Sequence, residues 1–230
     1  MAIIGILGGM GPMATADLFT KIIQHTPANC DQEHIRIIID NHPQIPSRAD
    51  AILREMEDPL PKLLESAKIL ENAGADFIIM PCNTAHFWYD QVQASIKAPM
   101  LHIIKNAAAQ IKASHSSLSG KIMLLATDAT VNTRMYQEAF AAQGMELLIP
   151  EQADQDTVVW TIDQVKAGNI GEIEPFTQLL DKYAAKGVEA FIGGCTEIPL
   201  LFPFLKGDYQ KFDPTLLLAK AAISKAMNEK

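Results

Sequence analysis

Short apolar runs alternate with amphipathic helical patterns along the whole chain. In the first half the apolar runs lie at 3–7, 35–40 and 76–80, and they are rich in isoleucine. One helical pattern begins near Ala14, after the first run, and another ends near Ala73, before the third. Strands that alternate with helices in this way are typical of a parallel α/β sheet.

The second half repeats the order of the first. Apolar runs at 121–127, 145–150 and 189–195 follow one another, with helical patterns between them. Cys82, after the third run of the first half, corresponds to Cys195, at the end of the third run of the second, with an offset close to half the chain. The pattern predicts a duplicated α/β unit, although generic α/β patterning also produces weak repeats of this kind.

Glycines mark where the predicted helices end. The residues Leu63, Ala67 and Leu70 have the spacing of one helix face, and this stripe stops at Gly74. Gly187 closes the corresponding helix of the second half. Glycine adopts the left-handed backbone that ends a helix at little cost, so a strand is expected directly after each of them.

These patterns predict a fold class and domain boundaries. The class is α/β, with two pseudo-symmetric parallel-sheet domains and the active site in the cleft between them. We place the boundary near residue 98, and we expect the C-terminal helix at 214–227 to return to one half. The first domain then comprises 1–98 plus 210–230, and the second comprises 99–209.

Composition narrows the class of partner. The chain has 230 residues, 48% of them hydrophobic, which is enough for one large domain or two small ones. A net charge of −8 and a pI near 5.2 exclude a general nucleic-acid binder, because no basic stripe is available to replace phosphate counterions. No apolar run approaches the roughly 20 residues of a membrane helix.

Three cysteines, an odd number, favour free thiols in a reducing cytoplasm. Homodimers are common among enzymes, and one is expected here on that ground alone.

Both third apolar runs end in a cysteine followed by small polar residues. Cys82 lies in FIIMPCNTAH and Cys195 in FIGGCTEIP. Ligands of parallel α/β sheets bind at the carboxyl ends of strands, so two facing halves would present the two thiols to opposite sides of one small molecule. Inversion of a carbon centre needs a base on one side and an acid on the other. A single buried cysteine is usually a small apolar side chain, but a matched pair favours this chemistry. Cys30 has no counterpart and is interpreted as a structural or surface thiol.

The residues after each cysteine are expected to tune the thiol. Thr84 is placed to cap a helix that begins near His86, and Thr196 lies similarly before IPLLF. A helix N-terminus stabilises a thiolate and lowers its pKa. Asn83 offers amide donors to a carboxylate. His86 lies four residues after Cys82, but no further ligands at a suitable spacing complete a metal site.

The first strand of each half leads into a candidate anion-binding turn. Met10 and Gly11 lie in GILGGMGPMA, where backbone N–H groups would approach an anionic group. A plain strand-to-helix turn that needs glycine explains the loop equally well, and the spacing is not the dinucleotide fingerprint. In the second half, Thr127 with Thr130 would donate a hydroxyl to a substrate carboxylate, or else close a turn of its own.

Two cations are candidates for holding an acidic side chain. Arg48, in IPSRAD, has the planar fork that binds a carboxylate through two parallel hydrogen bonds. Lys166 lies at the end of a helix, just before Gly168. Its ordinary structural role there is a favourable interaction with the C-terminal end of the helix dipole, and most lysines in such places are solvated.

These motifs together resemble the cofactor-independent aspartate/glutamate racemase family, and in particular its aspartate racemase branch. The resemblance is carried by GGMGP at 8–12, PCNTAH at 81–86 and GCTE at 194–197, with Arg48 nearby, and it covers essentially the whole chain. The glutamate branch typically has histidine after Cys-Thr, whereas this chain has Glu197. Some broad-specificity relatives replace the first cysteine with threonine, and this chain keeps Cys82.

The resemblance implies two pseudo-symmetric α/β domains with an acidic amino acid between them, no pyridoxal phosphate and no metal. It also implies that Cys82 and Cys195 are the two acid/base residues and that Arg48 and Lys166 hold the side-chain carboxylate. We therefore hypothesise an amino-acid racemase that interconverts L- and D-aspartate, with glutamate left open as a further substrate. Which thiol serves which enantiomer also stays open.

Two other functions remain open from the sequence. One is a decarboxylase or cis–trans isomerase of small dicarboxylates from the same superfamily, in which a single cysteine would be essential. The other is a protein that binds acidic metabolites without turnover, which predicts thermal stabilisation by aspartate and dispensable cysteines.

Overall fold

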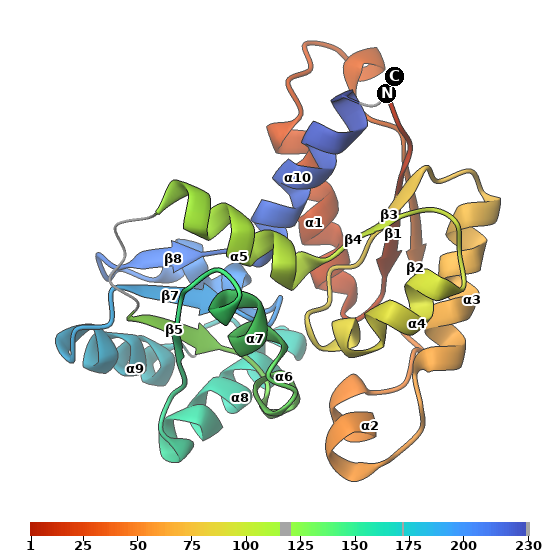
Figure 1. Ribbon diagram of the computed structural model, residues 1–230. Helices are drawn as coiled ribbons and strands as arrows, with labels where there is room; N and C mark the ends of the chain where they lie inside the picture. Colours follow the sequence, from red (N-terminus) through yellow and green to blue (C-terminus); the bar gives the residue numbers. More distant parts are fainter. Residues whose placement is uncertain (116–120, 172, 229–230) are drawn as a thin grey trace. The chain divides into compact units, whose positions relative to one another are not determined.

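The computed structural model describes residues 1–115, 121–171 and 173–228. The chain forms two compact units, which are drawn in Figure 1. The first comprises Met1–Asn106 with Thr215–Lys230, and the second comprises Ala107–Pro214. Within the described ranges, no helix is both long enough and apolar enough to cross a membrane.

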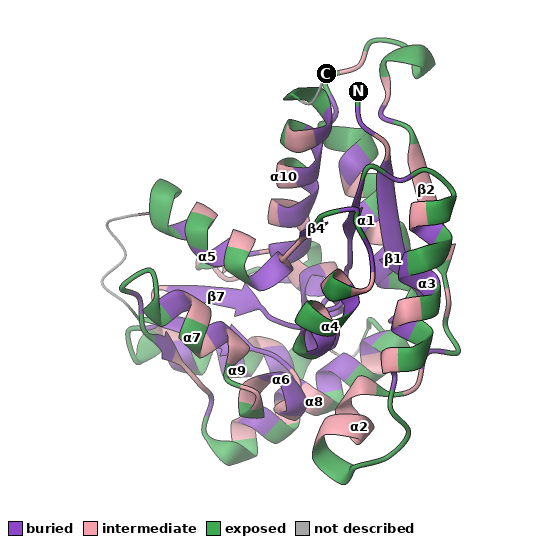
Figure 2. Ribbon diagram, turned by 45° about the vertical axis from the view of Figure 1, so that its right-hand side comes forward, coloured by how far each residue is buried: buried purple, intermediate pink, exposed green. Residues whose placement is uncertain are grey.

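The first unit is a parallel sheet of four strands with helices on both faces. Its strands are β1 (Ile4–Gly8), β2 (Ile37–Asn41), β3 (Phe77–Ile79) and β4 (Met100–Leu101), in the order β2-β1-β3-β4. Its helices are α1 (Pro12–His25), α2 (Arg48–Arg54), α3 (Leu60–Asn72), α4 (Tyr89–Ala94) and α10 (Pro214–Asn228), with the 3₁₀ helices η1 (Asp31–Glu33) and η2 (Thr84–Trp88). Helices α1 and α10 cover one face of the sheet and α3 covers the other (Figures 1 and 2).

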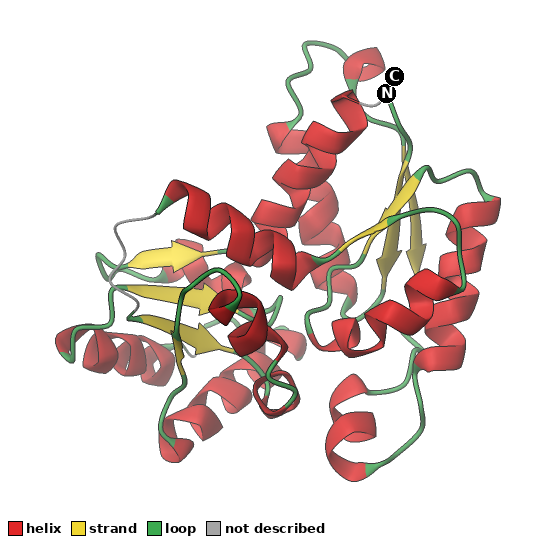
Figure 3. Ribbon diagram, viewed as in Figure 1, coloured by secondary structure: helices red, strands yellow, loops and turns green. Residues whose placement is uncertain are grey.

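The second unit repeats this topology. Its strands are β5 (Ile122–Leu125), β6 (Leu147–Leu148), β7 (Ala190–Gly193) and β8 (Gln210–Phe212), in the order β6-β5-β7-β8. Its helices are α6 (Asp128–Asn132), α7 (Met135–Ala141), α8 (Gln152–Lys166) and α9 (Glu174–Ala185), with the 3₁₀ helix η3 (Ile198–Phe204), and α5 (Ile103–Ser114) leads into it from the first unit. Figure 3 shows the strands of each sheet side by side. The prediction of an α/β fold with two similar parallel sheets is confirmed.

The units divide at places that differ from residues 98 and 210. Strand β4 is hydrogen-bonded to β3, with Ile78 opposite Met100, and so belongs to the first sheet. Strand β8 is hydrogen-bonded to β7, with Ile192 opposite Phe212, and so belongs to the second. Both strands are only two or three residues long, and their pairing, rather than their composition, identifies them.

The central strands β1, β3, β5 and β7 are fully buried, whereas the edge strands β2 and β8 are partly exposed, as Figure 2 shows for β1 and β2. In β5, Met123 and Leu125 pack against α8 and α9, whereas the alternate residues Ile122 and Leu124 point to the opposite face and are also fully buried. Strands covered on both faces are almost entirely apolar, which explains why apolar runs of the sequence predicted these central strands.

Helix ends follow the glycine signals. Helix α3 buries Leu63, Ala67 and Leu70, as predicted, and it ends before Gly74, whose φ is +94°. The N–H of Gly74 bonds to the Glu71 carbonyl, and β3 begins within three residues. This left-handed residue turns the chain back towards the sheet.

Two glycines with the same φ provide a matched test of this geometry. Gly9 and Gly74 both have φ of +94°, but a Cβ at Gly9 would lie 2.4 Å from the backbone of His42, whereas a Cβ at Gly74 would meet nothing within 4 Å. We expect Gly74→Ala to lower the free energy of unfolding by about 1 kcal/mol, from the φ penalty alone. Gly9→Ala should cost about 3 kcal/mol or more, because the overlap with backbone adds to that penalty. Urea unfolding of both variants measures the difference, and equal losses would contradict the backbone contact.

Candidate active site

The first candidate half-site lies at the carboxyl end of β3. Cys82 follows this strand by three residues, its side chain is 6% exposed, and it belongs to the same apolar cluster as Met10 and Ile45. Because β1 pairs with β3 in parallel, with Ile6 opposite Ile79, the loop after β1 and the loop after β3 leave the same edge of the sheet. The structure therefore brings the predicted glycine loop and Cys82 together.

A short 3₁₀ helix, not an α-helix capped by a threonine, follows Cys82. Thr84 is the first residue of η2, and its N-cap is Asn83, which makes no side-chain cap hydrogen bond. The prediction that Thr84 caps a helix at His86 is therefore wrong. Asn83 and Thr84 follow Cys82 in the chain, and both are buried.

His86 fixes the loop that carries Cys82. Its Nδ1 lies 2.8 Å from the Cys82 carbonyl oxygen, and its Nε2 lies 3.2 Å from the backbone N–H of Ile103. Only the tautomer with a proton on Nδ1 satisfies both partners, donating to the carbonyl and accepting from the amide. Burial lowers the pKa of His86 to about 4, so the ring is neutral at pH 7.

The glycine loop is held by one threonine side chain. Thr15 Oγ1 accepts the Gly9 N–H at 2.9 Å and donates to the Gly11 carbonyl at 3.1 Å. Gly11 is the N-cap of α1, and Met10 is 4% exposed. The loop is thus a well-ordered strand-to-helix turn, and binding of an anion by Met10 and Gly11 stays a prediction.

Arg48 is the first residue of α2, which contacts η2 just beyond Cys82. Its Nη1 donates to the carbonyl oxygens of Ile45 and Pro46, at 3.1 and 3.0 Å. Its Nε is buried and has no hydrogen-bond partner. Two backbone contacts therefore anchor the guanidinium and leave further N–H groups available.

The second candidate half-site lies at the carboxyl end of β7. Cys195 follows this strand by two residues, is 8% exposed, and donates its thiol proton to Glu197 Oε2 at 2.9 Å. The Thr196 hydroxyl donates to the same oxygen at 3.2 Å. Thr127 follows β5 at the same edge of the sheet as Cys195, because Leu125 lies opposite Gly193 in the parallel pairing of β5 with β7.

The electrostatics around Cys195 differ from the expectation. Burial, followed by the negative charge of Glu197, raises the pKa of the Cys195 thiol well above its ordinary value, although Lys166 acts in the opposite direction. The N-cap of η3 is Glu197, which places a carboxylate where a helix N-terminus was expected to stabilise a thiolate. The prediction of a lowered thiol pKa is wrong for Cys195.

Lys166 lies on this half-site, at the end of α8, which contacts η3. Although burial disfavours its ammonium form, electrostatic interaction with the pair of Cys195 and Glu197 raises the pKa of Lys166. Its Nζ is also 3.4 Å from Asp163 Oδ1, so the side chain has a partner on its own helix.

The sequence did not point to two buried polar residues of the second half-site. Tyr136 of α7 is fully buried, and burial, with the negative charges of Cys195 and Asp213, raises the pKa of its phenol well above the usual range. Gln155 of α8 donates from Nε2 to the Ala126 carbonyl at 2.9 Å.

Thr127 closes a turn of its own, one of the two roles that the sequence left open, and donation of its hydroxyl to a substrate carboxylate stays a prediction. Its Oγ1 accepts the Thr130 N–H at 3.3 Å and lies 3.1 Å from Thr130 Oγ1, so it caps α6. Thr127 is half-buried at the carboxyl end of β5, and its hydroxyl is shared within this turn.

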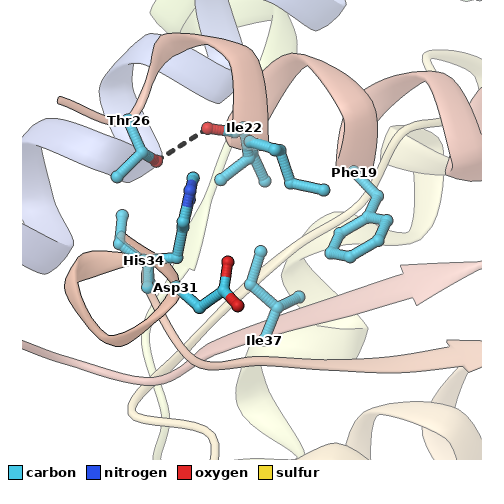
Figure 4. A pocket seen from close by; sticks show the side chains of 8 residues that line it. Phe19, Ile22, Thr26, Asp31, His34 and Ile37 are labelled. Carbon is cyan, nitrogen blue, oxygen red and sulfur yellow. Dashed lines mark hydrogen bonds between the residues drawn. The ribbon is translucent and has the colours of Figure 1, made fainter. Parts of the chain in front are cut away.

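A separate cavity of about 320 Å³ lies in the first unit, between α1, η1 and β2 (Figure 4). Phe19, Ile22 and Ile37 form its apolar walls, with Asp31 and His34 at the side of η1. Ile37 begins β2, so this cavity is at the amino ends of the strands, whereas Cys82 follows a carboxyl end. It is therefore distinct from the candidate active site.

Comparison with known proteins identifies the family. A sequence model of the Asp/Glu/Hydantoin racemases matches residues 7–222. The chain belongs to this family. Among curated relatives of this racemase-family protein, the broad specificity amino-acid racemase RacX of Bacillus subtilis is 28% identical over 226 residues, 96% of each chain.

Solved structures agree with this assignment. The aspartate racemase of Picrophilus torridus is 32% identical, with a TM-score of 0.88 over 99% of this chain and 95% of that one. An aspartate racemase homologue from Pyrococcus horikoshii is 27% identical, with a TM-score of 0.79 over 99% and 100%. The resemblance carried by the two cysteine motifs is thereby confirmed.

The buried state of His86 predicts a pH dependence of stability. Its pKa falls from 6.5 to about 4 on folding, so the neutral ring stabilises the racemase fully above pH 6.5. That contribution is lost as the pH falls towards 4, and at about 1.4 kcal/mol per pKa unit it amounts to about 3 kcal/mol. Between pH 7 and pH 4, His86→Gln should therefore lose about 3 kcal/mol less stability than the unsubstituted protein in urea unfolding.

A direct observation accompanies that measurement. Nitrogen-15 NMR of the histidine rings at pH 5 should show His86 neutral, with its proton on Nδ1. A charged His86 at pH 5, or equal pH slopes in the two proteins, would contradict the buried neutral ring.

Proposed function

We propose that this protein is a cofactor-independent racemase that interconverts L- and D-aspartate. One observation carries the proposal: each of two topologically identical sheets places a free, buried cysteine directly after the carboxyl end of its third strand. The family is that of the Asp/Glu/Hydantoin racemases, and relatives named as an aspartate racemase and as a broad specificity racemase both match nearly the whole chain.

The proposed chemistry is a direct proton transfer with two thiol groups. One cysteine, as the thiolate, takes the α-proton of aspartate, and the electron pair of the C–H bond stays on the carbon. The other cysteine donates its S–H proton to the opposite face of that carbon, which inverts the centre. Cys82 and Cys195 are the two residues to which we assign these roles.

The substrate's α-carboxylate takes up part of the negative charge that develops on the carbon. We assign its stabilisation to the small polar residues that flank the two thiols, and to backbone N–H groups of the glycine loop. These groups are Asn83, Thr84, Thr127 and Thr196, with Met10 and Gly11.

Specificity for an acidic side chain requires positive charge in an acidic protein. Arg48 supports this role, because its anchored guanidinium keeps a buried Nε without a partner beside the loop that follows Cys82. Lys166 supports it from the second unit, because its ammonium is held charged beside Cys195. We propose that the two cations bind the side-chain carboxylate of aspartate.

The first experiment follows the α-proton. L-Aspartate is incubated with the protein in heavy water, without added cofactor, and is followed by proton NMR together with chiral chromatography. We expect exchange of the α-proton and appearance of D-aspartate. Loss of carbon dioxide or isomerisation of a dicarboxylate would favour the related enzymes, and thermal stabilisation by aspartate without exchange would favour a binding protein.

Single cysteine variants test the two-thiol mechanism. Cys82→Ala and Cys195→Ala should each lower kcat/KM for racemisation of both enantiomers by at least about 10²-fold, since each removes one of the two proton-transfer groups. Cys30→Ala is the matched control, because Cys30 is exposed and lies outside both half-sites, and its activity should be unchanged. Full activity in either of the first two variants would rule out the mechanism.

A further inference from the structure

Cys195 and Glu197 form a closed pair in the second unit. The thiol donates to Glu197 Oε2 at 2.9 Å, a short distance for a sulfur donor, and the two side chains are 8% and 5% exposed. The hydroxyl of Thr196 donates to the same oxygen. Glu197 Oε2 thus accepts two hydrogen bonds in a buried site, and one of them places the Cys195 proton between sulfur and oxygen.

The charged and titratable groups around this pair come from two helices and a loop. Helix α8 supplies Lys166, with Asp163 beside it, and α7 supplies the buried Tyr136, which also interacts with Asp213. The cation of Lys166 lies next to a pair with a total charge of −1. Its stabilising effect persists when the proton moves from sulfur to oxygen, because the charge of the pair does not change.

The first half-site has no equivalent carboxylate. The residue two positions after Cys82 is Thr84, where the second half has Glu197. The two thiols therefore stand at matched places in matched sheets but differ in the group that follows them. Cys82 provides an internal reference for any effect of Glu197 on Cys195.

We propose that Glu197 is a positioning residue that acts through Cys195: it holds the shared proton on the sulfur in the free protein and takes it up when Cys195 acts as a base. When Cys195 acts as the acid, its S–H bond breaks and the proton goes to the α-carbon. When it acts as the base, the S–H proton first moves to Glu197 Oε2, and the sulfur then takes the α-proton as the C–H bond breaks. The inference rests on the proposed racemase function, and no further reactant is needed.

The test is Glu197→Gln, which keeps the shape and an oxygen acceptor but removes the charge. Iodoacetamide alkylation is followed against pH, and mass spectrometry resolves the peptides of Cys195 and Cys82 in the same sample. The midpoint for Cys195 should fall by about one pH unit or more. At any pH below both midpoints, the variant then has about tenfold more Cys195 thiolate than the original protein. The midpoint for Cys82 should not move.

Kinetics give a second readout. Racemisation by Glu197→Gln should lose about 10²-fold in kcat at neutral pH, with little change in KM for aspartate, because Glu197 does not touch the substrate. Its pH optimum should move to lower pH. Glu197→Asp keeps the carboxylate and should restore the alkylation midpoint towards the original value. Glu138→Gln makes the same charge change on an exposed position of α7 and should leave the Cys195 midpoint in place.

The outcomes separate this inference from the proposed function. Equal Cys195 midpoints in the original protein, Glu197→Gln and Glu197→Asp overturn the role of Glu197, whatever the activity. If Glu197→Gln does not fold, Glu197→Asp, whose carboxylate has a shorter reach, should lower the Cys195 midpoint part of the way with Cys82 unmoved, and an unchanged Cys195 midpoint overturns the role. If the original protein does not racemise aspartate, the proposed function fails, while the alkylation midpoints still decide where the proton is held.

Discussion

Parallel pairing of the central strands is the constraint on which the rest of the structure depends. β1 pairs with β3 and β5 pairs with β7, and parallel strands release their loops at one edge of the sheet. The loops that follow β1 and β3 are thereby neighbours, as are those that follow β5 and β7, although about seventy residues separate the members of each pair. The candidate site residues of each unit gather at this edge because the parallel backbone pairing brings these loops there.

The same scaffold carries different electrostatics in the two units. In the first, a neutral histidine ties the carbonyl of Cys82 to the start of α5. In the second, Cys195 is bonded through its sulfur to Glu197, with Lys166 nearby. A duplicated fold therefore does not impose equal proton affinity on two equivalent thiols, because that affinity depends on the one or two side chains that face each sulfur.

Most of the fold could be predicted from the sequence, because the central strands β1, β3, β5 and β7 are fully buried and their apolar runs are continuous. Strands β4 and β8 could not be predicted, since two or three residues next to proline or lysine carry no periodic signal. Within the site, the cysteines and Thr127 followed from their place at strand ends. The bond from Cys195 to Glu197 did not, because a side chain two residues away can point in any direction until the backbone of η3 is known. Tyr136 did not either, since its electrostatic interaction with Cys195 joins residues about sixty positions apart in the chain.

The first unit is assembled from two distant parts of the chain. Helix α10, with Leu218, Ala222 and Ala226 buried, closes one face of the first sheet, and the carbonyl of Ala226 accepts the N–H of Ala2 at 2.9 Å. The second unit is instead one uninterrupted segment. During synthesis, the whole second unit therefore leaves the ribosome before α10, which the first unit needs to complete its core. The unit whose strands are synthesised first thus has its complete core only after the second unit, and its maturation waits for α10 to be translated.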